Sequence, residues 1–185
     1  MAYPVFASGD TLLASDMNAV GKWLVTSGTI TTVSSVTVNN CFTSTYRNYE
    51  IVFSATASAA SGYVTVQFTV SGTATTTNYL TRTAQFYAAS LGYDLQDNVA
   101  GTDEIAIGLV GGTTPAHTLI RFTVGSPQLA QPTQVIASGP GSFGGNACYT
   151  TSNQGVQTAS TQFDGIKIIF PGNVSGTYRI YGLRD

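Results

Sequence analysis

Residues 49–70 read YEIVFSATASAASGYVTVQFTV and contain the two clearest strand patterns of the chain. In each half of this stretch, apolar side chains occupy every second position. The two apolar sets are Tyr49, Ile51, Phe53 and Ala55, followed by Val64, Val66, Phe68 and Val70. Alternation with a period of two predicts strands that bury one face. The small residues 59–62, Ala-Ala-Ser-Gly, predict that the two strands form a hairpin.

Weaker patterns of the same kind, separated by glycine and proline, extend over the rest of the chain. Residues 171–173, Pro-Gly-Asn, are expected to turn between the last two strands and to make a terminal hairpin. The Gly-, Ser- and Asn-rich stretch 139–157 is expected to be a long loop. The further strands are predicted at residues 23–32, 34–38, 79–88, 104–109, 118–124, 133–138, 163–170 and 177–183.

This succession of strands, without a second helical pattern, indicates an all-β fold class. We expect an antiparallel two-sheet sandwich of the jelly-roll type over residues 23–185, and an immunoglobulin-like sandwich is the rival arrangement. Residues 1–22 are expected to form a short extended and helical segment ahead of this domain. Ser15 can cap a helix over residues 16–20, which Gly21 ends. Such a short helix is unstable alone and must pack on the domain or on a partner.

The composition limits the classes of partner. Only 9% of the residues are charged, against about 25% in ordinary soluble domains. The formal net charge is −2, and Lys22 and Lys167 are the only lysines. This excludes a basic nucleic-acid-binding protein, because neutralising phosphates requires clustered cations. Low charge suits a protein whose outer faces are covered by sister subunits or by a larger particle, and a neutral extracellular β-domain is the alternative.

Targeting and redox signals are sparse. The sequence has no basic leader and no long apolar run, so we expect neither a secretory signal peptide nor a membrane-spanning segment. The two cysteines, Cys41 and Cys148, are too few for a zinc site and are not a disulfide framework. We expect two small buried apolar side chains, and their oxidation is left open. No cofactor is expected.

Three features of the sequence bear on catalysis or on the binding of phosphate or metal ions. Residues 139–144 match the GxGxxG string, but no helical pattern follows them, so a loop is expected rather than a phosphate site. His117 is the only histidine and is expected at a solvent edge or an interface. The acidic stretch contains Asp94, Asp97, Asp103 and Glu104. It fits neither a glycosidase pair nor a calcium loop well; Asp97 and Asp103 are weak calcium candidates, and a solvated hairpin tip is favoured.

Tyrosine is more abundant than the core of a small sandwich requires. Tyrosines on a surface stack on sugars and anchor protein interfaces. We take Tyr87, Tyr93 and Tyr149 as candidate contacts to a ligand or to a neighbouring subunit. Ordinary cross-strand pairing is the alternative for each of them.

Three blocks of the sequence resemble tailed-bacteriophage virion structural proteins. Residues 6–20, FASGDTLLASDMNAV, are similar to the opening of many such proteins. Residues 34–52, with the pattern S-V…F-T-S-T-Y-R-N-Y-E-I-V, resemble a recurrent strand pair of tail-fibre and minor structural proteins. The end, F-D-G-I-K-I followed by S-G-T-Y-R-I-Y-G-L, resembles the finish of the same family.

The resemblance implies a jelly-roll homotrimer on the virion surface, with no catalytic residues to carry over. It also implies that residues 1–22 attach the subunit to a tail protein or to the major capsid protein. The residues proposed for this attachment are Phe6, Asp10, Leu13, Met17 and Val20. The expected location is the virion, after synthesis in the cytoplasm of the host bacterium, without nucleic acid or membrane as a partner.

Several functions remain open at this point. The first is a trimeric tail-fibre or tail-tip appendage that contacts the host, with a host-surface glycan as one ligand class. The second is a capsid decoration or head-fibre protein. More distant alternatives are a glycan-degrading enzyme that uses the acidic stretch and a secreted lectin, and we expect no enzymatic activity.

Overall fold

The computed structural model describes residues 21–57, 62–87, 93–110, 116–143 and 147–183. Within these ranges the chain forms eleven strands joined by turns, without a helix. The predicted all-β class is therefore confirmed. The strands are β1 (Lys22–Val38), β2 (Asn48–Ala57), β3 (Gly62–Val70), β4 (Thr73–Ala74), β5 (Tyr79–Tyr87), β6 (Tyr93–Thr102), β7 (Ile105–Val110), β8 (Ala116–Gly125), β9 (Thr133–Phe143), β10 (Ala147–Gln157) and β11 (Gly165–Leu183).

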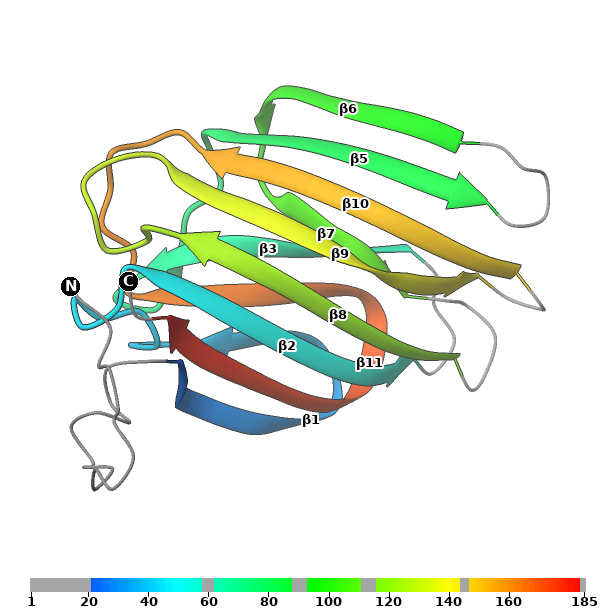
Figure 1. The fold of residues 1–185 in the computed structure, drawn as a ribbon, viewed down its shortest axis with the longest axis horizontal. Helices are drawn as coiled ribbons and strands as arrows, with labels where there is room; N and C mark the ends of the chain where they lie inside the picture. The colour runs from blue at the N-terminus through cyan, green and yellow to red at the C-terminus, as the bar shows by residue number, and fades with distance from the viewer. Residues whose placement is uncertain (1–20, 58–61, 88–92, 111–115, 144–146, 184–185) are drawn as a thin grey trace, which may run out of the picture.

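The eleven strands belong to one antiparallel sheet that curls into a half-barrel (Figure 1). Neighbouring strands follow the order β4-β3-β11-β2-β8-β9-β10-β5-β6, with β1 paired to β11 and β7 paired to β3. The long strands β1 and β11 bend together and contribute to both layers of the curled sheet (Figure 1). We call the layer that contains β2, β8, β9, β10, β5 and β6 the front layer. The layer that contains β3, β4 and β7 is the back layer.

The predicted hairpin between the two strands of residues 49–70 is wrong. Strand β11 lies between β2 and β3: residues 174–183 of β11 pair with β2, and residues 165–169 pair with β3. Both stretches do form strands, but residues 64–69 of β3 are all buried, so β3 buries both faces rather than the predicted one. A period-two pattern also does not specify the neighbouring strand. The strands face each other across the curl rather than lying side by side.

The predicted terminal hairpin is also wrong, because residues 165–183 form the single bent strand β11. Pro171 is exposed and lies between the ladder with β3 and the ladder with β2, so no ladder hydrogen bond needs its missing N–H. Opposite this bend, β1 has irregular register between Ile30 and Ser35, and Thr32 has a positive φ of 47°. Bulges of this kind increase the local bend of a strand.

The stretch 139–157, expected to be a loop, instead contains the end of β9 and the whole of β10, and these strands pair from Phe143 opposite Ala147 to Thr133 opposite Gln157. The inner face of β10 is polar, with Thr151, Asn153 and Gln157 all buried. Sequence patterns detect a strand by alternating apolar residues, and β10 has almost none.

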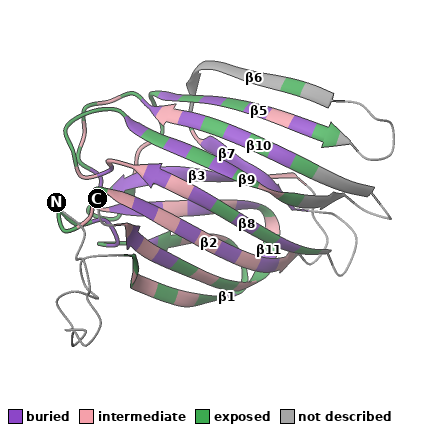
Figure 2. Cartoon of the chain, in the orientation of Figure 1, coloured by how far each residue is buried: buried purple, intermediate pink, exposed green. Residues whose placement is uncertain are grey.

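The core lies between the two layers, and buried and exposed residues alternate along the strands that enclose it (Figure 2). Its centre is aromatic: the ring of Phe68 on β3 stacks on Tyr79 at 6.4 Å and on Phe163 at 5.2 Å between centroids. A second stacked pair, Phe53 on β2 and Phe170 on β11, lies at 5.1 Å near the bend. Such aromatic pairs stabilise a core beyond their buried area, by about 0.5–1.5 kcal/mol each.

Two glycines allow β7 to lie close beneath the front layer. A side chain on Gly155 of β10 would overlap Ile105 of β7, and one on Gly108 of β7 would meet Ile120 Cδ1 of β8 at 2.6 Å. All six residues of β7 are buried. The absence of these two side chains therefore sets the spacing between the layers.

Candidate functional site

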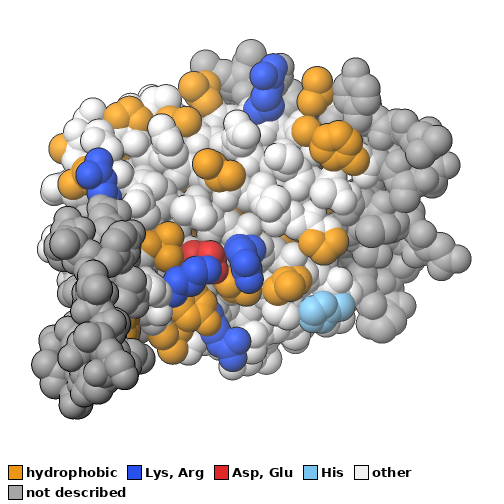
Figure 3. Space-filling model, in the orientation of Figure 1, with side chains coloured by type: hydrophobic (Ala, Val, Ile, Leu, Met, Phe, Trp, Pro, Cys, Tyr) orange, Lys and Arg blue, Asp and Glu red, His pale blue; other side chains and the backbone are white. Residues whose placement is uncertain are grey.

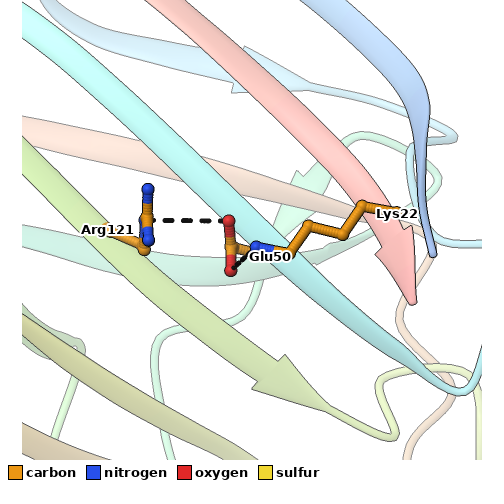
Figure 4. A network of polar contacts seen from close by, with 3 residues as sticks. All are labelled: Lys22, Glu50 and Arg121. Atoms are coloured by element: carbon orange, nitrogen blue, oxygen red, sulfur yellow. Dashed lines mark hydrogen bonds and ion pairs between the residues drawn. The ribbon is translucent and has the colours of Figure 1, made fainter.

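Some charged and reactive side chains lie close together in the described part of the structure, and they are on the outer face of the front layer. Glu50 of β2 lies at its centre between two cations (Figure 4). Lys22 Nζ of β1 lies 2.5 Å from Glu50 Oε2, and Arg121 Nε of β8 lies 3.7 Å from Glu50 Oε1. Both cationic side chains are well exposed, so each ion pair contributes no more than about 1 kcal/mol. The group links three strands rather than forming a charged cavity.

His117 of β8 is exposed on the same face, which agrees with the predicted solvent-edge position. Its Nε2 lies 3.0 Å from the hydroxyl of Ser54 on β2. A serine nucleophile needs both a base and a third group that orients that base. No carboxylate contacts His117 within the described ranges, so this pair has no orienting acid there.

A shallow hollow of about 390 Å³ opens on the outer face over β9, β10 and β5. We call it the front-face hollow. Two cross-strand rows form it, Leu80–Val156–Gln134 and Arg82–Gln154–Ile136. Ile136 is 60% exposed and Leu80 is 39% exposed. Figure 3 shows this face as mostly uncharged, with scattered hydrophobic side chains.

The acidic stretch is not the hairpin tip that we expected. Asp94 and Asp97 lie within β6. Asp97 is in register with Arg82 of β5. Asp103 is exposed at the bend before β7, and its carbonyl oxygen accepts a hydrogen bond from the Gln67 amide at 3.0 Å. No group of three or more metal-ligating side chains occurs among the residues that the structure describes.

The three candidate contact tyrosines come together in the backbone register. Tyr149 of β10 is directly opposite Tyr87 of β5, and Tyr93 of β6 is opposite Phe86. Their side chains lie outside the described part of the structure. The sheet thus brings Tyr149 to the same end of three adjacent strands as Tyr87 and Tyr93, which are distant from it in sequence.

Other predicted residues are only partly placed. The proposed attachment residues Phe6, Asp10, Leu13, Met17 and Val20 lie outside the described residues. Cys148 belongs to β10, but its side chain is not described. Residues 139–143 of the GxGxxG match lie within β9 rather than in a loop before a helix.

Cys41 is a buried free thiol, as predicted. Its Sγ donates a hydrogen bond to the Val38 carbonyl oxygen at 3.4 Å. Burial is the main cause that raises the pKa of Cys41 to about 12. Because the thiolate is the reactive form, the folded protein keeps this cysteine unreactive.

Sequence reasoning placed Tyr49 on a buried face but gave no such indication for Tyr79, the other tyrosine that stabilises the core. Tyr49 is fully buried; its hydroxyl accepts a hydrogen bond from the Thr43 N–H at 2.6 Å and donates one to the Thr43 carbonyl at 2.7 Å. Tyr79 is also fully buried, and burial raises the pKa of both hydroxyls. The available signal was the position of Tyr49 within an apolar set of the period-two pattern.

Comparison with protein-family models, with curated proteins and with solved structures gives no match. Among the described residues, no helix has the length and apolar character needed to cross a bilayer. The function is therefore argued from the residues of this chain.

Proposed function

We propose that this chain is a structural protein on the surface of a tailed-phage virion. The observation that carries the proposal is the outer face of the front layer, which exposes several large apolar side chains. These side chains are Leu24, Leu80, Phe86, Leu95, Leu119 and Ile136, each between 39% and 60% exposed. Six exposed large apolar side chains on one face of a chain with so little charge suit a surface that a partner covers.

The sequence blocks that resemble virion proteins support the same proposal. In it, the curled sheet is a jelly-roll subunit of a homotrimer, and residues 1–22 attach the subunit to the particle. Closed symmetry protects edge strands that otherwise promote open-ended association. Strands β1 and β6 are such edges within the described part of the sheet.

A tail-fibre or tail-tip position is the function that we favour. Tyr87, Tyr93 and Tyr149 would present stacking surfaces at one end of β5, β6 and β10. Weak contacts of each copy with a host-surface glycan would be multiplied by the copies in the trimer.

The proposal is tested by locating the protein on intact particles. Particles would be reconstructed by cryo-electron microscopy with and without an antibody fragment against this chain. Added density at the tail tip is expected, and density on the capsid would instead identify a decoration or head-fibre protein. Absence of the chain from purified particles, measured by mass spectrometry, would refute a virion role.

A further inference from the structure

The front-face hollow has a lining suited to one kind of occupant. Its floor contains the aliphatic side chains Leu80, Val156 and Ile136. Amide groups of Gln134 and Gln154 border it. None of its lining residues is aromatic, so it lacks the flat stacking surface on which sugars bind. Aliphatic floors with amide borders fit the apolar side chains of a peptide, with backbone hydrogen bonds to the amides.

Charge narrows the choice of peptide. Among the described side chains, the outer face carries the cations Lys22, Arg82, Arg121 and Arg179 and the carboxylate Glu50. The face is therefore net positive, which disfavours packing against the same face of a second copy. Residues 1–20 contain two aspartates and no lysine or arginine, and their apolar residues include Leu13, Met17 and Val20.

The segment is long enough to cross the whole front layer of one copy, so a hollow at a similar distance on a neighbouring copy is within its reach. From β1 to β10 there are five strand spacings, which correspond to about 24 Å at about 4.8 Å each. Twenty residues in extended form span at most about 66–72 Å. Because β1 is an edge strand, the segment leaves the sheet at its border, where a neighbouring copy can lie.

We propose that residues 1–20 of one copy bind the front-face hollow of a neighbouring copy. Leu13, Met17 and Val20 contact the aliphatic floor, and the carboxylate of Asp16 faces the cationic outer surface. The inference rests on the proposed role of residues 1–22 in attaching the subunit to the particle: the part of the particle that they bind is a neighbouring copy of this chain. The subunits would thus be joined by exchanged segments.

Cross-linking of the full-length chain tests the contact. In a Cys148→Ser background, Ile136→Cys is combined in turn with Leu13→Cys, Met17→Cys and Val20→Cys, and a short bismaleimide is added. We expect covalent dimers and trimers whose linked peptides are identified by mass spectrometry. Thr37→Cys, an exposed position on the back-layer half of β1, replaces Ile136→Cys as the control and should give none. Links only within one chain, or equal links to the control, would overturn the proposal.

A single substitution provides a second test. Ile136→Asp in the full-length chain places a carboxylate on the floor of the hollow, and its exposure allows the domain to fold. We expect the dissociation constant of the oligomer to rise at least tenfold by sedimentation equilibrium. Val70→Asp, at an exposed apolar position of β3 outside the front layer and outside the hollow, should leave it within about twofold. Equal effects of both variants would refute binding at the hollow, whereas the location of the protein on particles would be unaffected by that result.

Discussion

Replacing Tyr79 with phenylalanine removes one oxygen atom at a point where one edge of strand β3 has no paired strand. One edge of β3 is shared by β7, which pairs as far as Val66, and by β4, which begins pairing at Thr69. Between them, the N–H of Phe68 donates to the hydroxyl of Tyr79 at 2.8 Å. The tyrosine hydroxyl thus takes the place of the carbonyl that a neighbouring strand would supply.

The size of the effect follows from which groups lose a partner. The Thr75 hydroxyl lies 2.6 Å from the Tyr79 hydroxyl but also donates to the Phe68 carbonyl at 3.1 Å, so it retains a bond. The Phe68 N–H loses its acceptor at a site where both rings are fully buried. One unsatisfied buried donor costs about 1–3 kcal/mol, and we expect a loss of about 2 kcal/mol for Tyr79→Phe. For a chain of this size, that lowers Tm by about 4–8 °C.

The assay is equilibrium unfolding in urea, followed by far-UV circular dichroism and by the fluorescence of Trp23, the only tryptophan. Coincidence of the two transitions checks two-state behaviour. Tyr181→Phe is the matched control, because this partly exposed tyrosine has no hydroxyl partner among the described residues. It should change the free energy of unfolding by less than about 0.5 kcal/mol. If Tyr79→Phe is as mild as the control, the assignment of its hydroxyl as a replacement strand acceptor is wrong.

Three further substitutions probe other parts of the sheet. The pKa of Cys41 is about 12 in the folded protein, above the ordinary 9.0. The contribution of the buried neutral thiol to the free energy of unfolding is therefore complete below pH 9 and declines as the pH rises toward 12. Cys41→Ala should therefore flatten the fall in unfolding free energy between pH 9 and pH 10, measured in urea at each pH. Gly155→Ala forces a methyl group against Ile105 and should destabilise the fold by about 1–3 kcal/mol in thermal unfolding, unlike Gly125→Ala, which meets only ordinary contacts. Glu50→Gln should cost less than about 1 kcal/mol and should lessen the salt dependence of stability, because both cationic partners are exposed.

The strands predicted from the sequence illustrate which patterns carry information. Strands β2 and β3 were found because apolar residues occupy every second position in each, although β3 is buried on both faces. Strand β10 was missed because Thr151, Asn153 and Gln157 occupy its inner face. The two hairpins were wrong because a turn signal shows that the chain bends or loops, not which strand becomes the neighbour.

The same contrast between local sequence patterns and the pairing of distant strands applies to the candidate site. The exposure of His117 was predicted correctly. Its contact with Ser54, however, joins two residues that are 63 positions apart in the sequence and lie on different strands. The register that places Tyr87 opposite Tyr149 depends on β10 lying beside β5. The front-face hollow has no local signal at all, because its lining comes from three strands.

The amino-acid sequence by itself determined that this chain forms strands, has an aromatic core and carries few charges. These properties depend on residue type and on the spacing of near neighbours, so they are local. Only the tertiary structure decided that β11 separates β2 from β3, that Tyr79 completes the edge of β3, and that the front-face hollow exists. Each of these depends on which distant strands pair, and that choice comes from packing over the whole sheet rather than from any one segment.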